Sequence, residues 1–353
     1  MGRQGELSRP RQPLTPADES FRHQAVAPAL ETAHVDPAWA ERCWHLLNVG
    51  GGWVLGAGRA VWPHGGRRTA VAGLCTGATQ LSLRLREPFA AGDDPDRADV
   101  GPVRIEAVRP LEEIRLVLDD PGFGLAFDLT WRARFAPVAT DRNRIERDGV
   151  VVTDYMNLFQ SGLYSGVVRV DGEERRLDGR AGFRDRGWGL RKHEGTARRG
   201  MHVFCACELP DEALYVLLYE TASGRRVFTN GWLLDASGHA DTVVDAEHDL
   251  RLDGRRLLEG RLGVELASGA RREVRFEAEG RLWMETLGYT AVPGRADPGA
   301  ERWDVTDPAV RAELDGMFDN PCVFEADGVA GHGFVEVGLG DHERYRPAGS
   351  ATG

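Results

Sequence analysis

Residues 184–191 hold the densest group of side chains that could do chemistry: three arginines, one carboxylate and one tryptophan. A carboxylate between arginines normally stays ionised, so Asp185 is a poor proton donor unless it is buried. Two interpretations of Asp185 remain open, an ion pair that locks two strands or domains, and a polar anchor at a cavity wall. Trp188 either packs in a core or offers its face to a conjugated or cationic substrate.

A strand-like run downstream places four side chains on one face, namely His202, Phe204, Ala206 and Glu208. If His202 and Glu208 point into a cavity, they can serve as acid and base. The alternative is a hydrogen-bonded core histidine with a glutamate at the rim. Tyr215, Tyr219 and Glu220 raise the same choice.

Residues 154–166 mix aromatic side chains with amides and hydroxyls, the composition of a largely apolar pocket with a few placed polar groups. Tyr155, Gln160 and Tyr164 are its candidate substrate contacts, and a strand with interfacial tyrosines is the alternative. Nearer the N-terminus, Trp44 and Trp62 either line the mouth of a barrel or plug it.

Signatures of cofactor chemistry are missing from the sequence. The Gly-Ala-Gly run at 56–58 lacks the third glycine of a dinucleotide loop, and neither a phosphate-binding loop nor a Gly-x-Ser-x-Gly turn occurs. The ten histidines are scattered, and neither His-Glu-x-x-His nor Cys-x-x-Cys is present. We therefore expect no cofactor and no metal, and a hydrophobic small molecule as the substrate.

The charge of the chain excludes several classes of partner. A net charge of −11 at pH 7 argues against nucleic-acid and anionic-membrane binding. No apolar run reaches the roughly 18–20 residues of a membrane span, and the polar N-terminus lacks the apolar region of a secretory signal. Five cysteines without a framework spacing fit reduced thiols. These features predict a cytoplasmic protein, and they carry no signal for its oligomeric state.

Strands must position these residues. Glycine accounts for 44 of 353 residues, well above its usual share of roughly 7%, and its even spread indicates many turns. Two-residue alternation indicates half-buried antiparallel strands at 81–85, 114–118 and 126–131. Asp171-Gly172 predicts a hairpin turn between two further strands.

A few helices interrupt the strands. Residues 38–47 are expected to be partly helical, whereas 282–291 are expected to form a strand. Asp307 is suited to cap a helix that begins at Pro308. Apolar residues recur behind this start at helical spacing, namely Val310, Leu314 and Phe318.

A weak internal repeat indicates two similar domains. Residues 182–185 and 333–336 both read Gly-Phe-x-acid, and Asp185 and Glu336 lie 151 positions apart, a sensible domain length. The sequence predicts a disordered leader over 1–19, a first β domain over 20–190, a second over 191–345 and a disordered tail over 346–353.

The run 160–166, the Asp-Gly turns and the Arg-Asp-Arg-Gly-Trp-Gly motif at 184–189 resemble the tandem lipocalin-like family of carotenoid hydratases (hydroxyneurosporene synthases) and AttH-like proteins. Decalin-forming Diels–Alderases are more distant relatives. The resemblance covers about residues 20 to 340. It implies an all-β fold of two tandem calycin barrels with a few short helices, an apolar ligand cavity and no cofactor.

Family members usually read Arg-Asp-His-Ser-Trp-Gly, and the histidine and tryptophan of that motif are thought to handle the proton and the carbocation. Asp185, Trp188 and Gly189 match the motif. Arg186 replaces its histidine, and an arginine stays protonated and cannot relay a proton as histidine does.

Three functions follow. The first is a cofactor-independent cyclase or isomerase that shapes a hydrophobic polyketide or isoprenoid of secondary metabolism in a barrel cavity. In it, Arg186 or Gln160 polarises a carbonyl and Trp188 stacks on the reacting bonds. The second is a hydratase or dehydratase of an isoprenoid double bond, with the acid supplied by His202 and Glu208 or by Tyr219 and Glu220. The third is a non-enzymatic carrier of an apolar metabolite.

Overall fold

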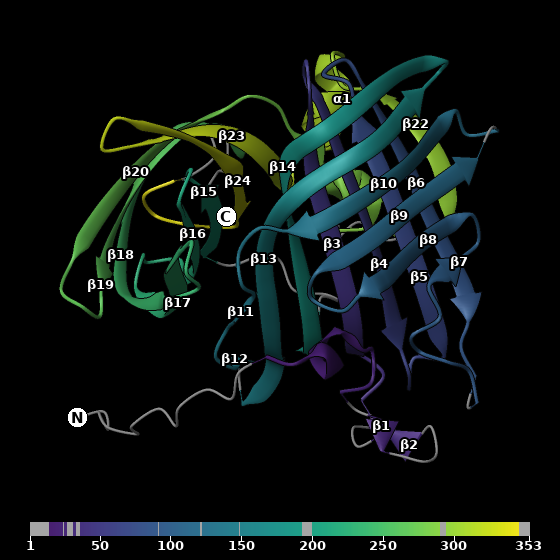
Figure 1. The fold of residues 1–353 in the computed structure, drawn as a ribbon, viewed down its shortest axis with the longest axis horizontal. Coiled ribbons are helices and arrows are strands. Elements are labelled where there is room, and N and C mark those ends of the chain that lie inside the picture. The colour runs from purple at the N-terminus through teal and green to yellow at the C-terminus, as the bar shows by residue number, and fades with distance from the viewer. Residues whose placement is uncertain are drawn as a thin grey trace.

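The computed structural model describes residues 14–23, 25–26, 31–32, 36–90, 92–120, 122–147, 149–192, 200–289 and 294–345. Nearly all of them form antiparallel strands, which gather into two large sheets (Figure 1). Residues 1–13 of the expected leader and the expected tail at 346–353 lie outside the described residues. A separate pair of short strands, β1 (Ala25–Val26) and β2 (Glu31–Thr32), lies near the N-terminus.

The first sheet contains thirteen strands. They are β3 (Trp39–Gly50), β4 (Trp53–Trp62), β5 (Arg67–Cys75), β6 (Thr79–Pro88), β7 (Asp99–Val100), β8 (Val103–Arg109), β9 (Glu113–Asp120), β10 (Leu125–Ala133), β11 (Val138–Ala139), β12 (Asn143–Arg147), β13 (Val150–Val170), β14 (Glu173–Arg191) and β22 (Gly299–Asp304). The main path runs β22-β6-β5-β4-β3-β14-β13-β10-β9-β8-β7, with β11 and β12 paired to β13. Because β7 and β8 return to lie against β5, the sheet curls around its own core.

The second sheet contains β15 (Met201–Glu208), β16 (Glu212–Glu220), β17 (Arg226–Asp235), β18 (Ala240–Asp253), β19 (Arg256–Leu266), β20 (Arg271–Ala278), β21 (Leu282–Trp283), β23 (Phe318–Ala326) and β24 (Val329–Leu339). Since β20 also pairs with β23, eight of these strands close into a barrel. Cys205 and Cys207 point together into its core, and all five cysteines of the chain are buried free thiols. The two sheets confirm the predicted all-β, tandem-barrel fold.

Several predicted elements are confirmed in detail. The three alternating runs lie in β6, β9 and β10, and Asp171-Gly172 joins β13 to β14. Both turn residues have positive φ, 51° and 86°, as a tight hairpin of this kind requires. Helix α1 (Pro308–Glu313) begins at Pro308, and the Asp307 carboxylate accepts a hydrogen bond of 2.8 Å from the Ala309 N–H. The helix ends before the expected helical position Phe318, which begins β23. Among the described helices, not one has the length and apolar character needed to cross a membrane.

Two predicted elements are wrong. Residues 39–50 form strand β3 and not a helix. Their even-numbered side chains Trp44 and Leu46 face the second sheet and their odd-numbered Cys43 and Leu47 face the first barrel. A strand buried on both faces lacks the polar alternation that identifies a strand. The predicted strand at 282–291 ends at Trp283, and Met284–Leu287 form a 3-10 helix, η2; residues 290–291 lie outside the described residues.

Two segments bind to the first sheet from outside its continuous run of strands. Strand β22 falls in the range expected for the second domain, but it pairs with β6. Beside it, the Gln80 amide donates to the Trp283 carbonyl at 3.1 Å and to the Thr286 hydroxyl at 3.0 Å. In the range expected for the leader, Pro16–Glu19 form a 3-10 helix, η1, and the Glu19 side chain is buried.

A third apolar cluster joins the two sheets, and we call this region the junction. Phe159 of β13 and Phe183 of β14 pack against Phe204 of β15, with ring centroids 4.6 and 5.0 Å apart. Side chains on β14 therefore alternate between the first barrel and the junction, because neighbouring residues of a strand point to opposite faces.

We expect Phe183→Ala to lower the free energy of unfolding by about 3–5 kcal/mol, because it removes a buried aromatic ring from the junction. Urea denaturation followed by tryptophan fluorescence measures this loss. Phe183→Leu keeps most of the apolar volume and is the matched control, with an expected cost below about 1.5 kcal/mol. Equal losses in the two variants would show that the junction is not tightly packed at this position.

Candidate functional site

The two Gly-Phe-x-acid repeats meet at the junction. Each repeat lies on the last long strand of its own barrel, β14 beside β3 and β24 beside β15. These last strands lie against each other. Phe183 and Phe334 both belong to the junction cluster, and Asp185 is close enough to Glu336 for their charges to interact. Folding thus brings together two acids that are 151 positions apart in the sequence.

A group of hydrogen-bonded polar side chains surrounds these acids. Asp319 of β23 lies directly opposite Glu336 on β24, and their side chains are hydrogen bonded. Glu336 Oε1 is also 2.6 Å from His202 Nε2. The Trp44 indole N–H donates to Asp319 Oδ2 at 2.9 Å. We call this group the acid cluster; its members are Trp44, Asp185, His202, Asp319 and Glu336.

The surroundings of the three carboxyl groups drive their pKa values apart. Burial, reinforced by the charge of Glu336, raises the pKa of Asp319 well above its ordinary value and thereby favours its protonated form. Burial also acts to raise the pKa of Glu336, but the hydrogen bond and charge of His202 outweigh it and lower the value to about 2. Burial raises the pKa of Asp185 to about 6 against the opposing charge of Arg42. Neighbouring acids with separated pKa values are what acid–base catalysis uses.

Two arginines and two tyrosines border the acid cluster. The guanidinium carbons of Arg42 and Arg191 lie 4.5 and 4.0 Å from the centre of the Tyr155 ring. Arg191 Nη1 donates to the Tyr289 hydroxyl at 3.5 Å. A β-carbon at Gly187 would lie 2.6 Å from the Tyr155 hydroxyl, so this glycine of the 184–191 motif makes room for the tyrosine.

The remaining aromatic members of the site also rest on glycines. Gly338 stands 151 positions after Gly187, and a β-carbon there would overlap the His202 ring. β-Carbons at Gly56 and Gly58 would lie 2.5 and 2.8 Å from the Trp44 indole. The Gly-Ala-Gly run, which does not form a nucleotide loop, therefore provides the flat surface on which Trp44 packs.

The members of the acid cluster differ in their exposure to solvent. Asp319 is only 4% exposed, whereas the side chains of His202 and Glu336 keep 25% and 24% of their exposure. Trp44 and Asp185 are half-buried. The acid that holds a proton is thus sheltered, and the base and the aromatic face beside it can be reached from outside. Such an arrangement can protonate a bound substrate and accept a proton from water.

The structure brings four of the predicted site residues together, namely Trp44, Tyr155, Asp185 and His202. The expected partnership of His202 with Glu208 does not form. Both lie on the junction face of β15, but they are six residues apart, roughly 20 Å along a strand. Glu208 forms an ion pair with Arg134 at the other end of the strand, and burial raises its pKa.

The predicted tyrosines of β16 lie on the same face. The Tyr215 hydroxyl accepts a hydrogen bond of 2.7 Å from the backbone N–H of Ser161, which links the two sheets. Tyr219 lies opposite His202 and stacks on Phe228 with ring centroids 6.1 Å apart. These contacts make both tyrosines neighbours of the acid cluster and not members of it.

Four predicted residues face the interior of the first barrel, on the opposite side of β13 and β14 from the acid cluster. They are Arg186, Trp188, Gln160 and Tyr164. The Trp188 ring stacks on His23 with centroids 4.0 Å apart, and the Tyr164 hydroxyl is 3.0 Å from His45 Nδ1. Gln160 accepts a hydrogen bond from Arg184, and Arg186 donates to the backbone carbonyl of Glu19.

The last two predicted residues lie farther away. Trp62 closes β4, with the Arg67 guanidinium 4.5 Å from its ring centre. Glu220 is buried at an end of the second barrel, where several charged or titratable side chains bind it. These are Arg226, His248 and His342. Neither contributes to the acid cluster.

Three residues of the site have no counterpart in the predictions, namely Asp319, Arg42 and Tyr289, and Arg191 is predicted only as a member of the 184–191 group. Glu336 was marked only as the end of the internal repeat, and that repeat was the signal that located it. Asp319 carries no comparable signal, since only the pairing of β23 with β24 sets it opposite Glu336.

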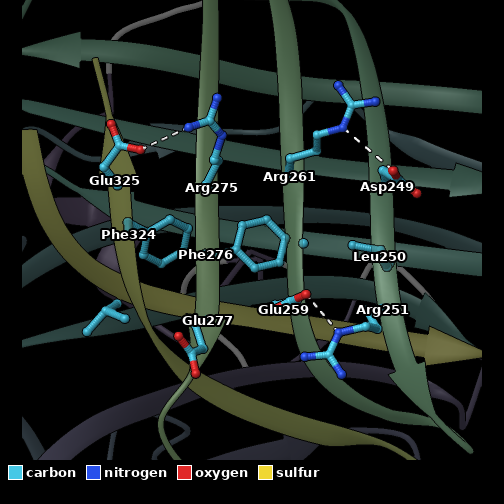
Figure 2. Close-up of a pocket in the computed structure, with 12 residues that line it drawn as sticks. Asp249, Leu250, Arg251, Glu259, Arg261, Arg275, Phe276, Glu277, Phe324 and Glu325 are labelled. Atoms are coloured by element: carbon cyan, nitrogen blue, oxygen red, sulfur yellow. Dashed lines mark hydrogen bonds and ion pairs between the residues drawn. The ribbon is translucent and has the colours of Figure 1, made fainter. Parts of the chain in front are cut away.

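A hollow of about 620 Å³ lies elsewhere on the second barrel, over β18, β19, β20 and β23 (Figure 2). Its charged side chains pair across strands, Arg275 with Glu325, Arg261 with Asp249 and Arg251 with Glu259. The apolar residues between these pairs belong to the barrel core. Because most of its charges are already paired, this hollow is a weaker candidate than the acid cluster.

Within the described ranges, no three histidine, cysteine or acidic side chains are grouped as metal ligands. The fold and the site therefore define a tandem-barrel protein with an acid cluster between its barrels. Residues 14–293 match the model of a family of unknown function, DUF8625, and the chain belongs to this family. No curated protein sequence matches the chain.

Solved structures share the fold. The AttH-like protein NE1406 from Nitrosomonas europaea superposes with a TM-score of 0.58 at 14% identity, covering 93% of this chain and 98% of its own. Kievitone hydratase from Nectria haematococca follows with a TM-score of 0.55 at 14% identity, covering 85% and 88%. CghA with Sch210972 has a TM-score of 0.49 at 14% identity, covering 86% and 89%. At these identities the likenesses show the fold alone, and they agree with the AttH-like part of the predicted resemblance.

We expect Asp319→Asn to reduce the loss of stability as the pH rises. In the wild type the folded chain keeps a proton that the unfolded chain releases above its ordinary pKa. The wild type therefore loses up to about 1.4 kcal/mol of stability per pH unit as the pH rises from about 4 toward the raised pKa. An asparagine can accept from Trp44 and donate to Glu336 without titrating.

Urea denaturation at several pH values between 4.5 and 8 measures this difference. The free energy of unfolding of the variant, minus that of the wild type, should increase with pH. Asp249→Asn is the surface control, because its side chain is half exposed. A difference for Asp319→Asn that stays constant with pH would contradict the raised pKa of Asp319.

Proposed function

We propose that this protein is a cofactor-independent enzyme of the hydratase and cyclase class that protonates a carbon–carbon double bond of a hydrophobic metabolite, with hydration or dehydration as the net reaction. The observation that carries the proposal is the pair of neighbouring carboxyl groups, Asp319 and Glu336, which lie opposite each other on β23 and β24 beside His202. Their surroundings raise the pKa of Asp319 and lower that of Glu336. A neutral acid beside an ionised base is the pair that addition of water to an alkene requires.

Each member of the acid cluster has a role in this reaction. Asp319 donates its proton to one alkene carbon, and the electron pair of the double bond forms the new C–H bond. The half-buried face of Trp44 and the carboxyl of Asp185 stabilise the positive charge on the other carbon. Glu336, held by His202, accepts a proton from water as the water oxygen forms the C–O bond. Transfer of that proton to Asp319 through their shared hydrogen bond restores the starting state.

This assignment accounts for the altered motif. The resemblance places the proton-handling histidine of the family at the position of Arg186, which faces the first barrel. In this chain the proton donor is instead Asp319 of β23, which accepts a hydrogen bond from Trp44 across the junction. The reaction therefore does not need a titratable group at residue 186.

A cyclase is the second candidate. The same protonation would start ring closure if a second double bond of the substrate, in place of water, attacked the cation. The apolar rings of Phe183, Phe204 and Phe334 beside the acid cluster favour this outcome, because they can exclude water from a folded chain. Hydrophobic isoprenoid or polyketide intermediates are the proposed substrates of either reaction.

Isotope incorporation separates the candidates. We would incubate linear isoprenoid and polyketide alkenes, and the matching tertiary alcohols, with the protein in H2¹⁸O and in D2O. A hydratase places solvent oxygen and one solvent hydrogen in the product, whereas a protonation-triggered cyclase places only the hydrogen. A pericyclic cyclase incorporates neither, and a carrier returns the compound unchanged. Either of the last two results would contradict the proposed proton transfer.

We expect Asp319→Asn to lower kcat by about 100-fold or more, since it removes the donated proton while keeping both hydrogen bonds. Glu336→Gln should have a similar effect. Glu259→Gln, on the distant hollow of the second barrel, is the control and should leave kcat unchanged. Full turnover by a folded Asp319→Asn variant would remove Asp319 from the reaction, and circular dichroism would establish that the variant is folded.

A further inference from the structure

Residues 14–23, which we call the N-terminal segment, fill one end of the first barrel. Their 3-10 helix η1 belongs to neither sheet, and in Figure 1 it lies close to β3 and β14. The Glu19 and Phe21 side chains of the segment are buried, and His23 stacks on Trp188 and lies 2.8 Å from Glu41. Side-chain contacts hold the segment in place, and strand pairing does not.

The Glu19 carboxylate accepts three hydrogen bonds from the first barrel. Arg184 Nη1 donates to Oε1 and Nη2 to Oε2, each at 2.8 Å. The backbone N–H of Leu111 donates to Oε2 at 3.0 Å. Arg184 is completely buried, and a parallel pair of guanidinium hydrogen bonds is the strongest way to bind a carboxylate. Burial acts to raise the pKa of Glu19, but the charge and hydrogen bonds of Arg184, the charge of Arg186 and the Leu111 N–H together outweigh it and lower the value to about 2.

Phe21 occupies a second part of the same site. Its ring centre lies 3.8 Å from the guanidinium carbon of Arg59 and 3.8 Å from that of Arg186. Arg186 also donates to the backbone carbonyls of Glu19, at 3.1 Å, and of Ser20. Arg59, Arg184 and Arg186 thus bind neighbouring groups of the N-terminal segment. These groups are one carboxylate, two carbonyl oxygens and one aromatic ring.

The barrel supplies too few anions for these cations. Arg184 has the neutral Gln160 amide as its other side-chain partner, with Gln160 Oε1 accepting at 2.7 and 3.1 Å. Arg59 donates to backbone carbonyls of the 95–97 loop, and its buried Nε has no hydrogen-bond partner among the described residues. Glu41, 3.5 Å from Arg186, is the barrel carboxylate nearest to that arginine.

His45, which lies nearby, adds no further positive charge. Burial, and then the charge of Arg184, lower the pKa of His45 to about 3, so its ring is neutral. Asp96, on the neighbouring loop, binds the backbone N–H of Phe21 and the Arg22 side chain. Without Glu19, Arg184 would be a buried cation with no carboxylate partner, which is a costly state.

We propose that this end of the first barrel is a binding site for a carboxylate carried on an apolar chain with an aromatic or conjugated end, and that the N-terminal segment occupies it while the ligand is absent. The site is separate from the acid cluster, because Arg184 and Arg186 lie on the opposite face of β14 from Asp185. The proposal of this binding site is therefore independent of the function proposed above, and failure of one leaves the other unchanged.

Weakening the contacts of the N-terminal segment should increase the measured affinity of the site for a carboxylate ligand. An internal occupant lowers the apparent affinity of a ligand by the fraction of molecules in which the site is open. We would titrate 6-phenylhexanoate into the wild type and into Glu19→Gln/Phe21→Ala by calorimetry. The double variant should bind the probe about tenfold more tightly or better. The uncharged 6-phenylhexanamide should show no such gain.

The control is Glu112→Gln, which changes an exposed carboxylate next to Leu111 and should bind like the wild type. The proposal is overturned if the double variant binds the acid no more tightly than the wild type does. It is equally overturned if the amide gains as much affinity as the acid, because Arg184 would then not recognise a carboxylate.

A second measurement uses the wild type and covers the case in which the double variant does not fold. Since the probe must displace the N-terminal segment, saturating 6-phenylhexanoate should speed hydrogen exchange at the amides of residues 19–21. Exchange in β3 and β14 should stay unchanged. If the segment exchanges at the same rate with and without the probe, the segment does not yield to a ligand and the proposal fails.

Discussion

The burial of β14 on both faces is the constraint on which the rest of the molecule depends. Because neighbouring side chains of a strand point to opposite sides, one run of residues serves two environments. Asp185 and Gly187 face the junction, whereas Arg184, Arg186 and Trp188 face the first barrel. Charged groups on both faces lie away from water, so each must find a partner or change its protonation state.

The two faces meet this requirement in different ways. In the junction Asp319 has another acid, Glu336, as its hydrogen-bonded neighbour, and burial raises the pKa of Asp319. In the first barrel the guanidinium groups are in excess, and the chain brings Glu19 from its N-terminal segment to neutralise Arg184. The protonated form of Asp319 can donate a proton to a substrate. The position of the Glu19 carboxylate is one where the carboxylate of a ligand can bind. These opposite solutions suit one face to proton transfer and the other to anion binding.

The tandem repeat explains why the acid cluster lies between the barrels. Each barrel ends on a strand that carries Gly-Phe-x-acid, and the two strands pack against each other, so the phenylalanines form an apolar cluster with the acids beside it. Glycines at equivalent positions, 187 and 338, then make room for Tyr155 and His202. Similar local sequences thus build one shared site whose two halves differ in chemistry.

Much of the local structure was readable in the residues themselves. Alternation, the Asp171-Gly172 turn, the Asp307 cap and the repeat identified strands, a hairpin, a helix and two barrels, because each depends on neighbours in the chain. Strand β3 was missed because both of its faces are buried. Alternation also shows which side chains share a face, but not what that face meets. The pairing of Glu336 with Asp319 and His202, and of Arg184 with Glu19, joins residues far apart in the chain, so only tertiary packing could decide them.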